Sequence, residues 1–205
     1  MDKNKTFNYK NYWELNYLLG QSSGTGSYGV LAEFKANVIN AYILKKNITS
    51  VIEFGCGDGN QLSYMDYKQY LGLDIAKSAI DLCKAQYGSD ENKSFLWYQP
   101  GYLINKSFIT AELVVCLDVL YHIVEDGDFI QTLNDIFSCA GKAVILYTKI
   151  AEADKETEIE TIKDRDIFKY LEKYKDFKVT ELIPQKHPGI SSADFIILER
   201  KELDI

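Results

Sequence analysis

A glycine-rich loop near residue 55 is the part of this sequence best suited to holding a ligand. The run VIEFGCGDGNQL at 51–62 predicts a short strand, a bend that contains three glycines, and a helix that begins near Asn60. Glycine permits backbone conformations and close ligand approach that a side chain would prevent, and N–H groups at a helix start remain free to bind a polar group. The run therefore predicts a ligand site at a strand-to-helix turn.

The second group suited to this chemistry is Asp74, nineteen residues beyond Gly55 at the predicted end of the next strand. A carboxylate in this place can accept both hydroxyl hydrogens of a ribose. Parallel strands bring their carboxyl ends to one edge of a sheet, so the glycine loop and Asp74 are expected to lie together. The pair predicts a nucleoside site.

The spacing within the loop separates two kinds of nucleoside cofactor. The dinucleotide fingerprint is G-x-G-x-x-G, whereas this loop is G-x-G-x-G. The carboxylate of Glu53, just before the loop, would also repel a pyrophosphate. A cofactor with a sulfonium, an ammonium and no phosphate tolerates these acids better. The residues therefore favour S-adenosylmethionine, with S-adenosylhomocysteine as the product. A nicotinamide-dinucleotide oxidoreductase and a non-catalytic cofactor-binding subunit remain as alternatives.

Strand-like and helix-like runs alternate from about residue 50, which is typical of a doubly wound α/β fold with a mostly parallel sheet. Helices are expected over 76–87 and from Asp126 or Asp128, as the cap, to near Gly141. A charged segment over 151–176 keeps one apolar stripe and predicts a solvated amphipathic helix. Strands are expected at 51–54, 70–73, 94–98, 113–117, 143–148, 177–184 and 193–199.

The two ends of the chain differ from this alternating core. The last two strand-like runs have too short a link for a crossover helix, which predicts an antiparallel pair. Residues 1–48 are expected to form an N-terminal lid or substrate segment, and 49–205 the cofactor-binding core of a single domain. The lead segment holds QSSGTGSYG at 21–29 and then a helix with four residues on one face, namely Leu31, Phe34, Val38 and Tyr42.

Composition excludes several classes of partner. Lys and Arg number 23 against 30 Asp and Glu, giving a formal net charge of −7, so the basic surface that nucleic acid requires is missing. No run reaches the length of a membrane span and the first residues lack the apolar core of a secretory signal, so a cytoplasmic protein with a small-molecule substrate is expected. The spacing of four cysteines and two histidines predicts no metal site. The oligomeric state stays open.

Four features together resemble class I S-adenosylmethionine-dependent methyltransferases: EFGCGDG at 53–59, Asp74, LDVLYHI at 117–123, and the terminal hairpin. The resemblance covers about 51–200 and implies a Rossmann-like sheet of seven strands with the last inserted antiparallel. It implies a ribose contact by Asp74 and an adenine contact by Ile75. The other implied cofactor contacts are Glu53, Gly55, Cys56, Gly57 and Asn60 along the methionine part, and Asp118 and Val119 from strand four.

One position departs from that family. Many members have an acidic residue after strand three for the adenine amine, whereas Tyr98, Gln99 and Pro100 stand here, and Gln99 is expected to accept that hydrogen bond. The lead segment further resembles methyltransferases of bacterial capsule and surface-polysaccharide gene clusters. This resemblance implies an acceptor oxygen on a sugar- or phosphate-derived precursor, with Ser27 or Lys35 near the cofactor carboxylate.

His122 is the imidazole nearest the predicted cleft. Its ordinary pKa of about 6.5 suits a general base that takes the proton from an acceptor hydroxyl. The alternative is a histidine that anchors its loop or packs against the first helix. The candidate substrate-contacting residues are Trp13, Tyr17, Tyr121 and His187.

Overall fold

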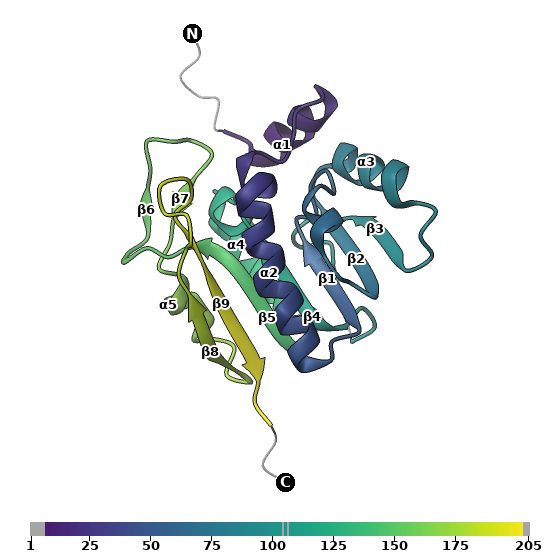
Figure 1. Ribbon diagram of the computed structural model, residues 1–205. Coiled ribbons are helices and arrows are strands. Elements are labelled where there is room, and N and C mark those ends of the chain that lie inside the picture. Colours follow the sequence, from purple (N-terminus) through teal and green to yellow (C-terminus); the bar gives the residue numbers. More distant parts are fainter. Residues whose placement is uncertain (1–6, 104, 106, 203–205) are drawn as a thin grey trace.

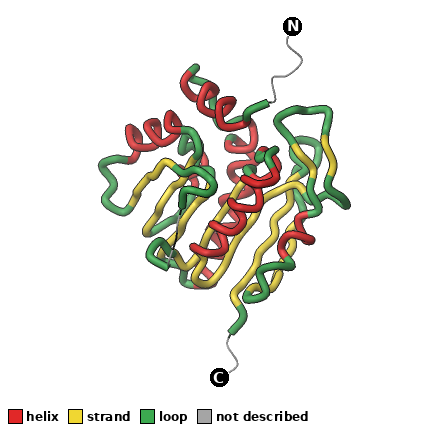
Figure 2. Tube along the Cα trace, turned by 180° about the vertical axis from the view of Figure 1, so that it is seen from behind, coloured by secondary structure: helices red, strands yellow, loops and turns green. Residues whose placement is uncertain are grey.

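The computed structural model describes residues 7–103, 105 and 107–202. A single twisted sheet forms the middle layer, with helices on both of its faces, as the opposite views in Figures 1 and 2 show. Among the described helices, none combines the length and apolar character needed to cross a membrane.

The sheet has seven strands in the order β3-β2-β1-β4-β5-β9-β8. The first five strands pair in parallel, and β9 pairs antiparallel with both β5 and β8. The predicted doubly wound fold with an inserted antiparallel last strand is confirmed. The strands are β1 (Ser50–Phe54), β2 (Gln69–Asp74), β3 (Lys93–Trp97), β4 (Ala111–Leu117), β5 (Ala140–Lys149), β8 (Phe177–Ile183) and β9 (Ala193–Arg200).

The helices divide the core into two layers. Buried side chains of α4 pack on one face of the sheet, and those of α2 and α3 pack on the other. Burial of each such apolar side chain stabilises the fold by about 1.5–3 kcal/mol. The α-helices are α1 (Tyr9–Leu18), α2 (Gly29–Lys46), α3 (Lys77–Tyr87), α4 (Asp126–Cys139) and α5 (Ile167–Leu171), and the 3₁₀ turns are η1 (Thr25–Ser27), η2 (Gln61–Tyr64) and η3 (Leu120–His122).

The prediction of one amphipathic helix over 151–176 is wrong. The segment forms a two-stranded hairpin of β6 (Lys155–Glu156) and β7 (Lys163–Asp164), followed by the short helix α5. Its charges are not all solvated, because Lys163 and Arg165 both pair with Asp126 at the start of α4. These ion pairs join the segment to the start of α4.

Three smaller expectations also need correction. The glycine loop leads only into the short turn η2, because β2 begins at Gln69 and leaves no room for a longer helix. Neither Asp126 nor Asp128 caps α4, whose N-cap is Glu125 without a side-chain hydrogen bond. Strand β3 is an edge strand with half-exposed Trp97, not a strand buried on both faces.

Candidate functional site

A cleft lies at the carboxyl ends of the parallel strands β1, β2 and β4, and α1 contributes one of its walls. The structure brings together ten of the predicted site residues there: Trp13, Tyr17, Ser27, Gly55, Gly57, Asp74, Ile75, Asp118, Val119 and His122. Sequence reasoning missed seven lining residues, which are Tyr9, Ser23, Phe54, Tyr98, Leu117, Ile123 and Thr132.

Two glycines let the loop approach the rest of the cleft closely. Gly55 has φ 86° and Gly57 has φ 57°, both in the left-handed region that disfavours other residues. A Cβ at Gly55 would lie 2.1 Å from Cγ2 of Val119, and one at Gly57 would lie 2.3 Å from Oγ of Ser23. The glycine requirement inferred from the sequence therefore has a steric cause on each side of the cleft.

Asp74 ties the glycine loop to the end of β2. Its Oδ2 accepts the N–H of Gly57 at 2.9 Å, and its Oδ1 accepts the N–H of Ala76 at 2.8 Å. Burial raises the pKa of Asp74 to about 6, although these two hydrogen bonds oppose the shift. Each carboxylate oxygen keeps a further lone pair, so the group can still accept hydrogen bonds from a ligand in the cleft.

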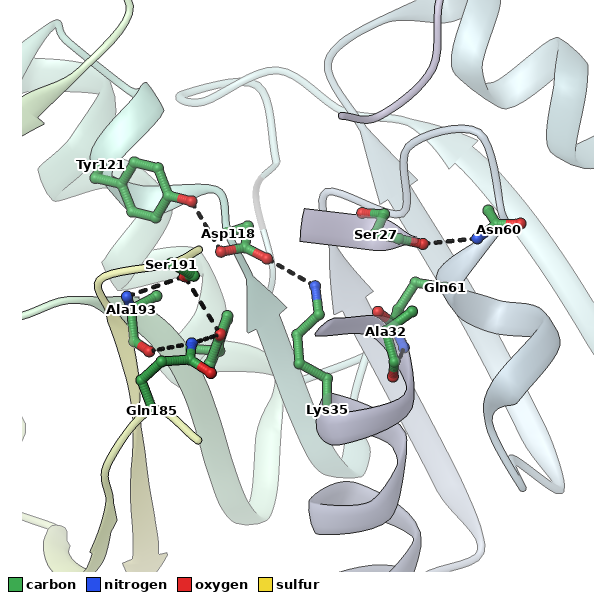
Figure 3. A network of polar contacts seen from close by, with 11 residues as sticks. Ser27, Ala32, Lys35, Asn60, Gln61, Asp118, Tyr121, Gln185, Ser191 and Ala193 are labelled. Carbon is green, nitrogen blue, oxygen red and sulfur yellow. Dashed lines mark hydrogen bonds and ion pairs between the residues drawn. The ribbon is translucent and has the colours of Figure 1, made fainter. Parts of the chain in front are cut away.

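The lead segment is fastened to the glycine loop. The N–H of Asp58 donates to Oγ of Ser23 at 2.9 Å, and the N–H of Ser23 donates back to Oδ2 of Asp58 at 2.8 Å. Tyr28 also donates its hydroxyl to Asp58. Nδ2 of Asn60 donates to the carbonyl of Ser27 at 2.6 Å, as Figure 3 shows. Asn60 thus anchors the lead segment and does not line the cleft.

A buried ion pair joins α2 to the end of β4. Nζ of Lys35 lies 2.7 Å from Oδ2 of Asp118, and the Lys35 side chain is 1% exposed. Tyr121 donates its hydroxyl to the other oxygen of Asp118 at 2.8 Å (Figure 3). These contacts hold Asp118 at φ 59°, a left-handed conformation that costs a non-glycine residue free energy. Tyr121 therefore supports Asp118 and does not line the cleft.

Glu53 and Cys56 are buried behind the cleft. Glu53 accepts the hydroxyl hydrogen of Tyr70 at 2.6 Å. Burial raises the pKa of Glu53 to about 7, against the opposing effects of this hydrogen bond and of the Lys35 charge. A hydrogen bond with Cys83 and burial both raise the pKa of the Cys56 thiol. Neither residue lines the cleft, so the cofactor contacts that the resemblance implied for them stay predictions.

His122 lines the cleft at the end of η3. Its Nδ1 lies 2.7 Å from the carbonyl oxygen of Thr161. A carbonyl can only accept, so Nδ1 carries the hydrogen and the neutral ring has its lone pair on Nε2. Burial lowers the pKa of His122, although the Thr161 hydrogen bond and the Asp118 charge oppose this shift. The ring also packs edge-on against Trp13, 5.3 Å between centroids. The arrangement provides a proton acceptor inside the cleft.

Two further predicted site residues lie outside the cleft. His187, in the connection between β8 and β9, packs its ring against Phe34 on α2 at 6.2 Å. Gln99 follows β3 in a turn in which its carbonyl accepts the N–H of Tyr102. The last sheet strands and the turn after β3 therefore place these side chains elsewhere.

One known protein family matches the middle of the chain. The family Methyltransf_12, described as a methyltransferase domain, matches residues 52–142. This range includes the glycine loop, Asp74, Asp118 and His122. No curated protein matches the sequence.

Solved structures resemble nearly the whole chain. Magnesium protoporphyrin IX methyltransferase (ChlM) from Synechocystis PCC 6803, with bound S-adenosylhomocysteine, has a TM-score of 0.69 at 14% identity over 94% of this chain and 98% of that chain. N-methyltransferase NodS from Bradyrhizobium japonicum WM9, in complex with S-adenosylhomocysteine, has a TM-score of 0.69 at 10% identity over 96% of this chain and 100% of that chain. The N-terminal domain of EvdMO1, with S-adenosylhomocysteine and D-fucose present, has a TM-score of 0.59 at 14% identity over 89% of this chain and 85% of that chain. The chain has the Rossmann-like fold of these methyltransferases.

Proposed function

We propose that this protein is an S-adenosylmethionine-dependent methyltransferase. Its acceptor would be an oxygen of a small sugar- or phosphate-derived precursor of a bacterial surface polysaccharide. The methyltransferase-domain match over 52–142 and the fold support the reaction class. The resemblance of the lead segment supports the polysaccharide part.

The observation that carries the proposal is the pairing of the glycine loop with Asp74. Gly55 and Gly57 let the cleft-lining side chains of Val119 and Ser23 pack directly against the loop, and Asp74 presents acceptor oxygens beside it. A ribose offers two hydroxyl donors, so Asp74 suits its edge. Ile75 lines the cleft next to Asp74 and would pack on the attached base. The residues present therefore fit an adenosyl group.

The charges of the cleft favour this cofactor over a dinucleotide. None of the described residues that line the cleft is a lysine or an arginine. The buried Lys35 nearby is already paired with Asp118. A pyrophosphate would meet the Asp74 carboxylate without a compensating cation in the lining, whereas a sulfonium is attracted by it. The same charges favour a sugar hydroxyl over a phosphate oxygen as the acceptor.

The chain contributes orientation and proton removal to the reaction. S-adenosylmethionine, when bound, supplies an electrophilic methyl group. Trp13 and Tyr17 of α1 wall the cleft and would hold the acceptor and exclude water, and such positioning contributes about 7–11 kcal/mol to lowering a barrier. Nε2 of His122 would take the acceptor's hydroxyl proton, because Thr161 holds the hydrogen on Nδ1.

Calorimetric titration tests the cofactor assignment. We expect S-adenosylhomocysteine to bind and NADH not to bind. Asp74→Ala should weaken binding roughly 10- to 150-fold, the loss expected for hydrogen bonds to a charged group. Asp81→Ala is the matched control, because Asp81 lies on α3 in an exposed ion pair with Lys77. Binding of NADH in place of S-adenosylhomocysteine would contradict the proposal.

The acceptor class is tested by methyl transfer. The protein would be incubated with isotopically labelled S-adenosylmethionine and a panel of neutral sugars, nucleotide sugars and sugar phosphates, and the products analysed by mass spectrometry. We expect the label on a sugar oxygen. Label found on a nitrogen, or on no member of a broad panel, would argue against this acceptor class.

A further inference from the structure

The hairpin after β5 supplies the carbonyl that orients the candidate base, so the contacts that hold this hairpin bear on the cleft. Thr161, two residues before β7, accepts the hydrogen on Nδ1 of His122, and β7 lies against η3, which ends at His122. A carbonyl oxygen orients an imidazole only while its main chain is held at hydrogen-bond distance. Arg165, the residue that follows β7, is placed to hold it there.

The Arg165 side chain joins the end of the hairpin to the link between η3 and α4. Its Nη2 donates to the carbonyl of Val124 at 3.3 Å and to Oδ1 of Asp126 at 2.9 Å. Val124 lies two residues after His122, and Asp126 begins α4. One guanidinium therefore connects the strand that follows Thr161 to the chain that follows His122.

The burial of Arg165 is more than the stability of the fold requires. Its side chain is 3% exposed, and Nε and Nη1 have no hydrogen-bond partner among the described residues. The guanidinium lies over the ring of Phe129, 4.1 Å from its centroid, which provides a cation–π contact. Replacing a buried ion pair by apolar side chains is often neutral or stabilising. The buried guanidinium therefore indicates a role in geometry.

Lys163 shares the same carboxylate but fixes the hairpin less closely. Its Nζ lies 3.0 Å from Oδ1 of Asp126, and its side chain is 14% exposed. This pair joins two side chains, whereas Arg165 also reaches the main chain of the link. An ammonium on a flexible stem restrains the distance between two segments less than a planar guanidinium does. Arg165 is therefore the side chain that we expect to set this distance.

We propose that Arg165 is a positioning residue for His122. Its guanidinium keeps the hairpin and the link together, so that the Thr161 carbonyl stays on Nδ1 and the lone pair of the neutral imidazole stays on Nε2. The proposal rests on the proposed function, in which Nε2 takes the proton of the acceptor. Arg165 does not line the cleft, so it affects turnover through His122 and not through a ligand contact.

Nitrogen-15 NMR of the imidazoles tests this positioning without cofactor or acceptor. The chain has two histidines, so His187 is an internal reference in every spectrum. At a pH where the ring is neutral, we expect His122 of the wild type to show one tautomer, with the hydrogen on Nδ1. Arg165→Met should release the Thr161 carbonyl and give a mixture of both tautomers. The Asp126 side chain is 60% exposed, so this variant leaves no buried charge behind and should fold.

Turnover and binding separate positioning from a general loss of structure. We expect Arg165→Met to lower kcat for a neutral hydroxyl acceptor roughly tenfold or more, part of the contribution of a general base, and to leave the affinity for S-adenosylhomocysteine unchanged. Arg200→Met is the matched control, because Arg200 stacks on Phe177 at 4.5 Å and donates to main-chain carbonyls at the amino end of β5. The control should keep the His122 tautomer and the kcat of the wild type.

A second variant keeps the proposal testable if Arg165→Met fails to fold. Arg165→Gln carries a shorter, uncharged amide that cannot span the Val124 carbonyl and Asp126, so the same mixture of tautomers is expected. A single Nδ1–H tautomer in whichever variant folds, or a mixture in the wild type, would overturn the role of Arg165 even if kcat falls. A wild type that neither binds S-adenosylhomocysteine nor transfers a methyl group would overturn the proposed function, whereas the tautomers would still decide whether Arg165 orients His122.

Discussion

Ser23 and Asp58 hydrogen-bond each other in both directions, through the two backbone N–H groups and the two side chains. The pair joins the lead segment to the glycine loop, 35 residues later in the chain. Ser23 also lines the cleft and would meet a Cβ at Gly57. The Asp58 carboxylate, outside the cleft, therefore helps to hold the lead segment over the loop, together with the Asn60 contact to Ser27.

We predict that Asp58→Ala speeds cofactor dissociation. The variant removes the acceptor of both Ser23 and Tyr28, at about 1–3 kcal/mol for each charged hydrogen bond lost, and releases the lead segment. The dissociation rate of S-adenosylhomocysteine, measured by stopped-flow displacement, should rise roughly tenfold or more. Asp66→Ala, an exposed change in the turn before β2, should leave the rate unchanged. A dissociation rate in Asp58→Ala equal to that of the wild type would exclude this role of Asp58.

We predict that His122→Ala slows transfer to a neutral hydroxyl at least about a hundredfold, the contribution typical of a general base. Burial lowers the pKa of His122 below 6.5, so the neutral base is present at pH 7 and the wild-type rate should fall only in more acidic solution. Single-turnover rates across pH measure both effects. His187→Ala, outside the cleft, is the control. A wild-type rate and pH profile in His122→Ala would remove this residue from the mechanism.

Lys35→Met should strongly destabilise the protein. It leaves Asp118 buried without its cation, which costs about 3–5 kcal/mol for pairs of this kind. Lys77→Met breaks the exposed pair with Asp81 and should cost about 1 kcal/mol or less. Urea unfolding at pH 7 measures both changes. Similar losses of unfolding free energy in the two variants would show that the Lys35–Asp118 pair stabilises the protein no more than an exposed pair does.

Glu53 makes stability depend on pH. Its pKa is about 7 in the folded protein against 4.5 as the ordinary value, so the folded state holds the proton that the unfolded state releases between these pH values. The unfolding free energy should therefore fall as pH rises from 4.5 to 7, on the order of 3 kcal/mol from this group. Glu53→Gln should flatten the curve measured by urea unfolding. A curve of unchanged slope would contradict the raised pKa.

The fold and the part of the cleft formed by the glycine loop and Asp74 could be predicted from the sequence. Apolar runs mark the seven strands, and the glycine spacing with Asp74 is a local signal that survives without a structure. Asn60 and Glu53 do not line the cleft, because a motif gives the position of a residue in the chain and not the direction of its side chain. Asn60 instead fastens the lead segment, and Glu53 is held by Tyr70.

The contribution of α4 to the cleft and the hairpin after β5 could not be predicted from the sequence. Thr132 enters the cleft only because α4 packs beside the ends of the strands, and no spacing in the sequence marks it. From the sequence, Lys163 and Arg165 are expected to be solvated surface charges. The structure shows that both pair with Asp126. Ser23 lies in the serine- and glycine-rich run at 21–29 and Tyr9 lies in α1, but no spacing in the sequence marks either as a lining residue.

The Thr161 contact has a consequence for how this protein tolerates change. The imidazole of His122 takes its orientation from a main-chain oxygen, which every amino acid possesses. Exchanging the side chain at position 161 leaves that oxygen in place, whereas inserting or deleting a residue in the hairpin would carry it away. The hairpin is therefore free to vary in composition at position 161 and constrained in length, and a library of hairpin lengths would affect turnover where a library of substitutions at position 161 would not.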